Sequence, residues 1–322
     1  MREHARVIVR YTLTALIGLG LCTGSLAEDS ESLRERINRG TVGVISGGVN
    51  GTYIRVTSDL AAVLDSDDLR VLSILGKGSV QGIADLLYLR GIDVAVVQSD
   101  VLEFIRRRGT YPTIDRRINY LTKLYNEEFH LLVRDDISSV QDLGGKKVNF
   151  DYEGSGTAMT AGIVFDTLGV PVQPTYYDQA AALEQLLAGE LSGLVYVAGQ
   201  PVQLFGSLGA DAPVKFLSIE YTPELMATYL PAKLVPESYP ALLGEGSAVS
   251  TIAVGAVLAA YNWEPGHPRY NKVARFVDRF FSNFEKFQSP ARHPKWREVN
   301  LSASVPGWSR FGPAEAWLGA HD

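Results

Sequence analysis

The chain has 322 residues, of which 46% are hydrophobic and 20% are charged, and its formal net charge is −6. This length exceeds that of an average domain, and the composition is that of a soluble globular protein with a sizeable core. The acidic balance, without a stripe rich in Lys and Arg, excludes nucleic acid as the expected partner.

Residues 1–27 have the pattern of a secretory signal peptide. Arg2, Arg6 and Arg10 give a positive start, an apolar run covers 11–21, and small residues precede a cleavage site after Ala27. The apolar run is shorter than the roughly 20 residues that a membrane-spanning helix needs. We therefore predict an exported, periplasmic protein rather than one with an N-terminal membrane anchor.

Cleavage after Ala27 changes both the charge and the cysteine content. It would leave 27 basic and 35 acidic residues, a net charge of −8, and would remove Cys22, the only cysteine. A lipid anchor on Cys22 is disfavoured because the bulky Leu21 precedes it. The mature chain then has no thiol for a disulfide, a metal site or a nucleophile, and we expect no metal and no cofactor.

The first part of the mature chain predicts three consecutive strand–helix units. Residues 28–40 form a charged lead-in, after which we expect strands over 41–45, 69–75 and 93–97, each followed by a helix, over 54–64, 80–89 and 101–107. Successive units of this kind indicate a parallel sheet covered by helices.

The rest of the chain predicts a crossing, a second α/β set and a return. Two short strands over 118–125 and 129–133 lead into the second set, 220–248 is irregular, and 251–258 is a strand that returns to the first set. In between we expect strands over 148–150, 170–177, 191–197 and 214–219, with helices over 158–168, 179–188 and 202–208. Residues 270–287 carry phenylalanine at helical spacing, which is typical of a core-facing helix.

Two strand–loop–helix junctions are candidate ligand sites. In the first, the strand at 148–150 runs into Ser155, Gly156 and Thr157, which are residues that turn the chain and cap a helix. The free N–H groups and the dipole at such a helix start favour a carboxylate or phosphate. The second junction, 46–53, is also rich in glycine but matches neither the dinucleotide fingerprint nor the P-loop.

The ordered set of these segments resembles the TAXI family of TRAP-transporter solute-binding proteins. The matching runs are ISGGVNGTYIRV at 45–56, GSVQGIADLLYLRGIDVAVVQSD at 78–100, DLGGKKVNFDYEGSGTAMTAG at 142–162, AALEQLLAGELSGLVYVAGQP at 181–201 and the Tyr-Pro stretch at 239–261. In place of the Asp that relatives carry after the corresponding turn, this chain has Ser192-Gly193.

The resemblance implies a type II periplasmic binding protein-like fold, α/β, with two lobes that are each a mostly parallel sheet flanked by helices. The lobes would be joined by two crossings, with lobe I formed by 28–130 plus 245–322 and lobe II by 131–244. It also implies that a small organic anion, such as glutamate or a related carboxylate, is bound between the lobes and delivered to TRAP permease membrane subunits. We expect the binding protein to be a monomer.

If the lobes close in this way, the loops at the carboxyl ends of the strands supply the ligand groups. The predicted ligand-binding residues are Asn50, Gly51, Thr52, Tyr53, Ser79, Gln98, Ser99, Ser155, Gly156, Thr157, Tyr196 and Gln200. Lys77 is left out, because a lone lysine on a loop is more often simply solvated.

Two other functions remain open. A sensor or adaptor that reports to a membrane receptor would have the same fold and pocket. A hydrolase using Ser155 is disfavoured, because G-x-S-x-G is absent and no histidine has a triad or metal-ligand pattern. His130 lies inside a predicted strand, and His267, His293 and His321 are in polar or terminal segments.

Overall fold

The computed structural model describes residues 38–321, and the chain from Val42 onward forms one compact unit. The predicted signal peptide at 1–27 and most of the lead-in at 28–40 lie outside the described residues. The fold below is that of the compact unit.

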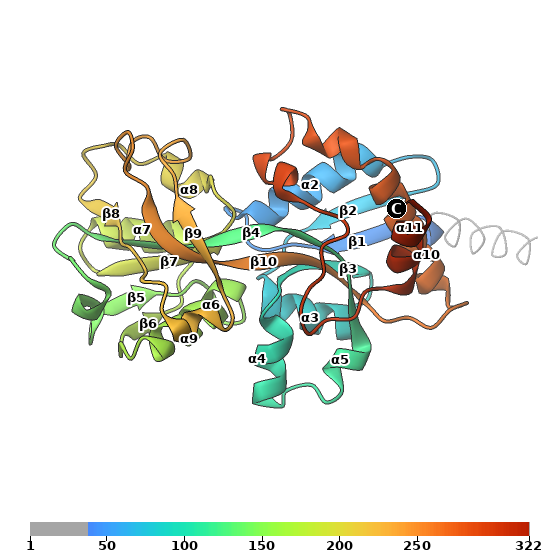
Figure 1. Cartoon of the computed structure of the whole chain (residues 1–322), viewed down its shortest axis with the longest axis horizontal. Helices are drawn as coiled ribbons and strands as arrows, with labels where there is room; N and C mark the ends of the chain where they lie inside the picture. Colours follow the sequence, from blue (N-terminus) through green and yellow to red (C-terminus); the bar gives the residue numbers. More distant parts are fainter. Residues whose placement is uncertain (1–37, 322) are drawn as a thin grey trace, which may run out of the picture. The chain divides into compact units, whose positions relative to one another are not determined.

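The unit is built on one ten-stranded mixed sheet, in which eight strands follow the order β2-β1-β3-β10-β4-β7-β5-β6 (Figure 1). In addition, β8 pairs with β4 and β9 pairs with β10. The strands are β1 (Thr41–Ile45), β2 (Arg70–Ile74), β3 (Val94–Gln98), β4 (Ile118–Arg134), β5 (Lys147–Asn149), β6 (Gln173–Thr175), β7 (Gly193–Ala198), β8 (Val214–Phe216), β9 (Leu230–Leu234) and β10 (Val249–Tyr261).

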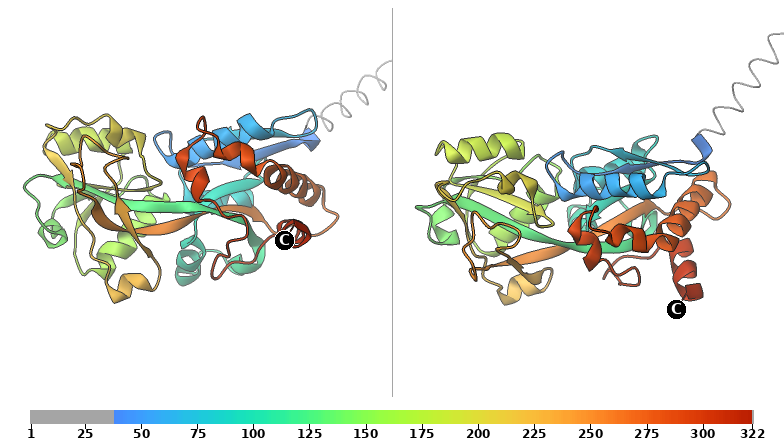
Figure 2. Two further views of the ribbon diagram at one scale, coloured as in Figure 1. Left: turned by 45° about the horizontal axis from the view of Figure 1, so that its top comes forward. Right: turned by 90° about the horizontal axis from the view of Figure 1, so that it is seen from above.

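Helices cover both faces of this sheet (Figures 1 and 2). The α-helices are α2 (Thr52–Leu64), α3 (Ser79–Tyr88), α4 (Val101–Arg108), α5 (Ile114–Arg117), α6 (Gly156–Thr167), α7 (Gln179–Leu187), α8 (Gln203–Gly206), α9 (Pro223–Met226), α10 (Pro268–Ser282) and α11 (Gly312–His321). Short 3-10 helices are η1 (Val140–Leu143), η2 (Phe284–Gln288) and η3 (Pro294–Glu298). The fold is therefore α/β, as the sequence predicts.

The hydrophobic core separates into four clusters, two on each face of the sheet. We call the part built on β1, β2 and β3 the first half, and the part built on β5, β6 and β7 the second half. In the first half, α2 and α10 pack on one face and α3 and α4 on the other. In the second half, α6 packs on one face and α7 and α8 on the other. Each half thus has its own core on both sides of the sheet.

Two long antiparallel strands, β4 and β10, run from one half into the other (Figure 2). Along β4, Tyr125 belongs to a first-half cluster and Phe129 to a second-half cluster. Along β10 the same change occurs between Val254 and Ala256, where the register shifts at Gly255. A register shift of this kind is typical of a β-bulge, which bends and twists the strand. The two halves are therefore joined through a narrow region at 126–128 and 255.

The structure differs from the sequence-based expectation in three places. Residues 118–134 form one continuous strand rather than two, because β10, β7 and β8 together pair with its whole length. The segment 220–248, expected to be irregular, contains α9 and β9. The helix expected over 270–287 ends at Ser282 and continues as η2, although Val273, Phe276 and Phe280 are buried as predicted.

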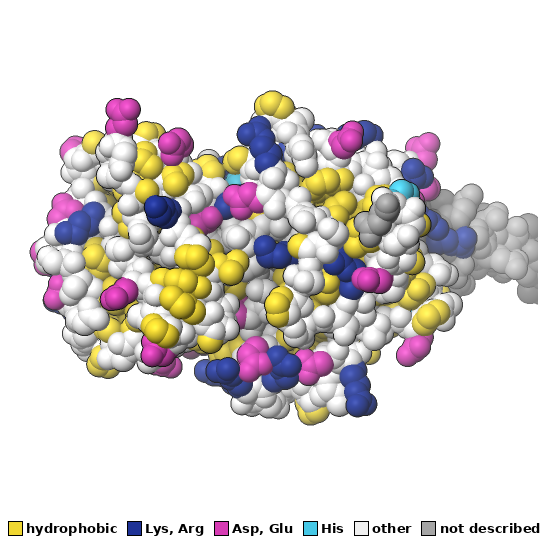
Figure 3. Space-filling view, in the orientation of Figure 1, with side chains coloured by type: hydrophobic (Ala, Val, Ile, Leu, Met, Phe, Trp, Pro, Cys, Tyr) yellow, Lys and Arg dark blue, Asp and Glu magenta, His cyan; other side chains and the backbone are white. Residues whose placement is uncertain are grey.

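Within residues 38–321, none of the helices combines the length and apolar composition needed to cross a bilayer. Over the same residues, no group of three or more His, Cys, Asp or Glu side chains is placed to hold a metal ion. On the face shown in Figure 3, basic and acidic side chains are interspersed.

Candidate functional site

Loops from both halves of the sheet line one small polar pocket, which we call the central pocket. From the first half, the lining residues lie after β1 and β2 and at the end of β3. From the second half, they lie after β5 and at the end of β7. In open α/β sheets, ligands bind beyond the carboxyl ends of the strands. The central pocket is therefore the candidate site.

Most of the residues predicted for the ligand site lie in this pocket. Nine of the twelve line it: Gly51, Thr52, Tyr53, Ser79, Gln98, Ser155, Gly156, Thr157 and Tyr196. The two strand–loop–helix junctions that the sequence singles out thus line the same space, although about 100 residues separate them in the chain. Whether these residues bind a ligand stays a prediction.

Three predicted residues do not line the central pocket. Asn50 lies in the turn before α2 and is half-buried. Ser99 is engaged through its backbone, because its N–H donates to the carbonyl of Gly255 and its own carbonyl accepts from the Trp308 indole. The Gln200 side chain donates to the Lys233 carbonyl at 2.8 Å and accepts from the Val235 N–H at 3.1 Å. It therefore holds β9 in place.

The central pocket is nearly closed. Its volume is about 40 Å³, whereas pockets for drug-sized ligands measure roughly 300–1,000 Å³. Space of this size accommodates on the order of one to three water molecules. A small organic molecule can therefore enter only when the two halves move apart.

Direct hydrogen bonds between the halves hold the pocket closed. The Thr52 hydroxyl donates to the Gly199 carbonyl at 2.7 Å, and the Gln81 N–H donates to the Gly154 carbonyl at 3.0 Å. On α6, Met159 packs within a first-half hydrophobic cluster. The contact between the halves is thus both polar and apolar.

The first turn of α6 is pressed against the first half. Ser155 caps the helix, since its Oγ accepts from the Ala158 N–H at 3.0 Å. Gly156 follows, and a Cβ added there would lie 2.2 Å from Gln98 Oε1 and 2.6 Å from Ser79 Oγ. Only glycine fits at this position while the halves are in contact.

Two of the pocket hydroxyls are already committed to protein partners. Thr157 Oγ1 accepts from the Val197 N–H at 3.1 Å, which ties α6 to β7. Tyr53 donates its phenolic proton to Glu127 Oε2 at 2.5 Å. Burial, and then the charge of Glu127, raise the pKa of Tyr53 well above its usual value, so the phenol stays protonated. The Tyr196 hydroxyl lies against Gly51, where an added Cβ would be 2.9 Å from it.

Sequence reasoning missed two buried acids in the central pocket, Glu127 and Asp151. They are only 2% and 9% exposed. Burial raises the pKa of Glu127 well above its usual range and that of Asp151 to about 7. The available signals were local: Glu127 interrupts an apolar strand sequence, and Asp151 lies three residues before the Gly-Ser-Gly-Thr sequence at 154–157. Perturbed carboxylates in a closed pocket are typical of functional sites.

Lys77, which the sequence analysis left out, also lines the central pocket. It follows β2 and is exposed to solvent, so it lies at the rim rather than in the interior. It is the only Lys or Arg among the described residues that line this pocket. Any negative group at the rim would meet this ammonium.

The hydrolase alternative needs a base, and the histidine of the crossing region does not supply one to Ser155. Among the described residues, His130 is the only histidine in the crossing region, and it is fully occupied. Its Nδ1–H donates to the Tyr196 carbonyl at 3.0 Å, which leaves Nε2 to accept from the Tyr239 hydroxyl at 2.7 Å. Burial lowers the pKa of His130 to about 4, so the ring stays neutral.

This buried histidine predicts a loss of stability in acid. Between pH 6.5 and 4 the unfolded chain takes up a proton on His130 and the folded chain does not, so stability falls as the pH falls. The expected contribution at pH 4 is roughly 3 kcal/mol. Urea unfolding from pH 8 to pH 4 should show a shallower loss in His130→Gln than in the wild type. Equal acid losses would contradict this assignment.

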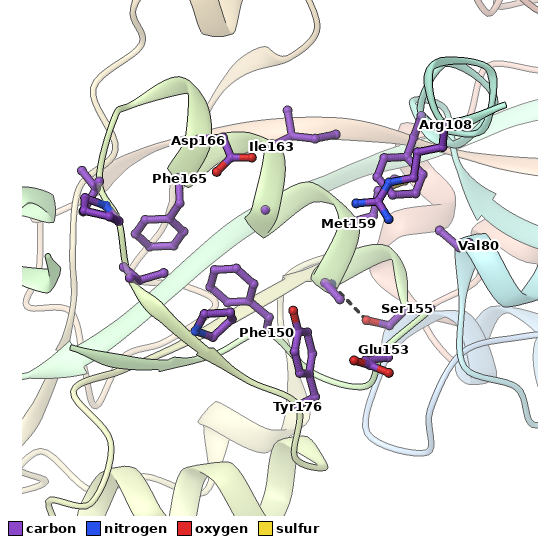
Figure 4. Close-up of a pocket in the computed structure, with 18 residues that line it drawn as sticks. Val80, Arg108, Phe150, Glu153, Ser155, Met159, Ile163, Phe165, Asp166 and Tyr176 are labelled. Carbon is purple, nitrogen blue, oxygen red and sulfur yellow. Dashed lines mark hydrogen bonds between the residues drawn. The ribbon is translucent and has the colours of Figure 1, made fainter. Parts of the chain in front are cut away.

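A larger hollow of about 630 Å³ lies along the side of α6 (Figure 4). Its wall contains Phe150 stacked on Phe165, and Glu153, Asp166 and Arg108 also line it. This hollow shares Ser155 with the central pocket, but it contains few of the strand-end loops. We favour the central pocket, because polar groups from both halves and two buried acids converge there.

The fold and the site define a class: an α/β protein with two halves joined by two long strands and closed over a small polar pocket. Residues 44–296 match the NMT1-like family. This match covers most of the chain, and the protein belongs to that family.

Solved structures that match this chain include several binding proteins. The alkanesulfonate-binding protein SsuA from Xanthomonas axonopodis pv. citri, bound to MOPS, is 14% identical, with 87% of this chain and 83% of that chain covered and a TM-score of 0.48. A TctC solute binding protein from Polaromonas is 17% identical, with 76% and 88% covered and a TM-score of 0.40. The periplasmic aliphatic sulphonate binding protein SsuA from Escherichia coli is 16% identical, with 87% and 78% covered and a TM-score of 0.39. At TM-scores below 0.5, we base no conclusion on these likenesses.

Proposed function

We propose that this protein is an exported, periplasmic solute-binding protein of the TAXI group that captures a small organic carboxylate and delivers it to a TRAP-type permease. The observation that carries the proposal is the convergence of loops from both halves on one closed polar pocket. No reaction is proposed, since the pocket serine caps a helix.

Capture would follow from hinge motion between two lobes, 28–130 plus 245–322 and 131–244. The crossing strands β4 and β10 connect the halves at 126–128 and 255, where the bulge allows bending. Opening would break the Thr52–Gly199 and Gln81–Gly154 hydrogen bonds and expose both loops. A ligand shifts this equilibrium only by its extra affinity for the closed form.

A carboxylate suits the donors that the closed pocket brings together. The start of α6 presents backbone N–H groups that have no partner within the helix, together with the positive end of its dipole. Ser79 and the start of α3 approach from the first half, and Lys77 adds a positive charge at the rim. These groups come from different halves, so an anion that contacts them all would stabilise the closed form.

A thermal-shift screen of the mature chain tests this function. We expect a subset of small organic acids to raise the melting temperature, because a ligand at about 100 times its Kd stabilises the folded state by roughly 2.7 kcal/mol. Uncharged analogues of the same size serve as controls. Stabilisation by none of the acids would contradict carboxylate capture, and turnover of a bound acid would favour an enzyme.

Delivery to a permease is separable from capture. In proteoliposomes containing the TRAP permease subunits, we expect uptake of the bound acid only when the binding protein, acting as a monomer, is added. Ligand binding without uptake, together with ligand-dependent association with a membrane receptor, would favour the sensor alternative.

A further inference from the structure

Asp100 lies where the two halves meet and does not line the central pocket. It is the residue directly before α4 in the first half and is only 6% exposed. Aspartate at this position commonly accepts from the first N–H groups of its own helix, but the Asp100 side chain makes no such bond. It contacts the second half instead, where two hydroxyl groups reach it.

Both hydroxyls contact the same carboxylate oxygen. The Thr160 hydroxyl, on α6, donates to Asp100 Oδ2 at 3.1 Å, and the Tyr229 hydroxyl, just before β9, donates to it at 3.4 Å. Thr160 Oγ1 also lies 3.3 Å from Gln98 Oε1, another acceptor of the first half. Thr160 and Tyr229 are 1% and 2% exposed. Because donors and acceptors belong to different halves, opening would break these bonds and expose Asp100.

The environment of Asp100 opposes a negative charge in the closed form. Its other oxygen, Oδ1, is buried and has no hydrogen-bond partner among the described residues. Within the same residues, no Lys, Arg or His lies within ion-pair distance of Asp100. Burying a carboxylate without a cation is costly while it is ionised and less costly once it is protonated. Burial accordingly raises the pKa of Asp100 to about 6.

The charged and titratable groups around Asp100 do not neutralise it. Burial, and then the charge of Asp100, raise the pKa of Tyr229 well above its usual value, so this phenol remains a donor. On β4, the pKa of Glu127 is raised by burial and also by the charge of Asp100. On α4, Arg107 is exposed and acts on Tyr229, and α6 contributes only Asp166, which is exposed further along the helix.

We propose that Asp100, Thr160 and Tyr229 form a latch between the halves that is more stable in acid, so that closing takes up a proton. This inference rests on the hinge motion of the proposed function and adds a pH control to it. With the proton on Oδ1, Oδ2 can still accept from both hydroxyls.

The sign of the effect follows from the two pKa values of Asp100. In the open form, water would surround the carboxylate and its pKa would return toward the usual value of about 3.9. The closed form has the higher pKa, about 6, and so binds the proton more tightly. The preference for the closed form is therefore full in acid and is lost as the pH rises through the closed-form pKa.

The test measures the distance between the halves by pulsed electron paramagnetic resonance on the ligand-free mature chain. The only cysteine of the sequence, Cys22, lies in the predicted signal peptide, so labels attach at introduced cysteines alone. Thr110→Cys follows α4 and Thr167→Cys ends α6, and both positions are exposed. We expect two distances, for the closed and open forms, and a closed-to-open ratio that falls about tenfold or more from pH 5 to pH 8.

Two variants assign this pH dependence to the latch. Asp100→Asn cannot ionise, so its fall between pH 5 and pH 8 should be about tenfold smaller than that of the wild type. Thr160→Val keeps the shape of the side chain but removes a donor. It should favour the open form more at pH 8 than at pH 5, because a hydrogen bond to an ionised carboxylate is stronger. The control Asp67→Asn removes an equal charge from the exposed turn between α2 and β2 and should behave as the wild type.

The outcomes separate the latch from the hinge motion. A fall in Asp100→Asn equal to that of the wild type, or no pH dependence in the wild type, would overturn the latch while the hinge motion stands. A single distance at every pH, in Thr160→Val as well as in the wild type, would show that the halves do not open. The proposed function and this inference would then fail together.

Discussion

Replacing Gly156 with Ala is expected to weaken ligand binding by roughly 5- to 150-fold while leaving the fold intact. The added Cβ would lie 2.2 Å from Gln98 Oε1 and 2.6 Å from Ser79 Oγ when the halves are in contact. Gln98 and Ser79 are fully buried: the Gln98 backbone N–H donates to Ser79 Oγ at 2.8 Å, and Gln98 Oε1 accepts from Ser79 Oγ at 3.4 Å and from Thr160 Oγ1 at 3.3 Å. They cannot move aside at low cost, and overpacking of this kind costs about 1–3 kcal/mol.

The cost falls on the closed form, because the clash lies between the two halves. In an open form the first turn of α6 would no longer contact Gln98, so the clash would be absent. Alanine would then favour the helix slightly, because its helix propensity is higher than that of glycine. Calorimetry should therefore show weaker binding, and urea unfolding without ligand should show a smaller change.

A matched control exists on the same helix. Gly162 has no atom within 4 Å of an added Cβ, so Gly162→Ala should bind normally and gain slightly in helix propensity. If Gly156→Ala binds the ligand as tightly as Gly162→Ala, ligand binding does not depend on close contact between α6 and the first half at Gly156.

The strand–helix units could be predicted from sequence because each of them is decided locally. Residues 41–45 are apolar, a Gly-rich loop follows, and the structure has β1 and α2 with nearly the expected bounds. The crossing could not be predicted in this way. The sequence Asn126-Glu127-Glu128 reads as a break between two strands, but the structure continues β4 through it.

This continuation depends on partners far away in the chain. Tyr53 satisfies Glu127, and Lys295 with the Gln200 N–H satisfies Glu128. No local pattern contains these contacts, so local reasoning places a loop where the tertiary structure supports a strand. The strand β9 was missed for the same reason, since its pairing with β10 is its main support.

The site residues that lie in loops at strand ends could be predicted from the sequence, and the one that lies on the crossing strand β4 could not. The nine lining residues that were predicted follow or end strands, as the general rule for α/β sheets requires. Glu127 lies in the middle of a strand and reaches the pocket only because β4 passes between the halves. Gln200 shows the opposite error. It was predicted to bind the ligand because it follows a strand, but its side chain is hydrogen-bonded to β9 instead.

Replacing Lys295 with Met is expected to lower the free energy of unfolding by about 3–5 kcal/mol. Lys295 is 2% exposed, and its Nζ donates to Glu128 Oε1 at 2.6 Å and to Glu298 Oε1 at 2.8 Å. Methionine keeps the apolar stem against Gly199 but leaves Glu128 buried without its cation. An unpaired buried charge is the costly outcome, more than the loss of the pair itself.

The pH dependence of the stability loss in Lys295→Met tests whether the unpaired charge of Glu128 causes it. Burial already raises the pKa of Glu128, and without Lys295 that pKa rises further. A carboxyl with a raised folded pKa is favoured in acid, so the deficit of Lys295→Met should shrink below about pH 5 and grow as the pH rises through the folded pKa. Urea unfolding at pH 5 and pH 8 measures this difference.

The double variant Lys295→Met with Glu128→Gln separates charge from packing. The substituted glutamine side chain has no charge to bury, and its carbonyl oxygen can still accept from the Gln200 N–H, which in the wild type donates to Glu128 Oε2 at 2.8 Å. We therefore expect the double variant to regain most of the stability and to lose the pH dependence. A double variant as unstable as Lys295→Met would show that the lysine stem, rather than its charge, supports the crossing. Recovery would show that the unpaired charge of Glu128 causes the loss, at the point where Glu128 joins Lys295 of η3 to the Gln200 loop.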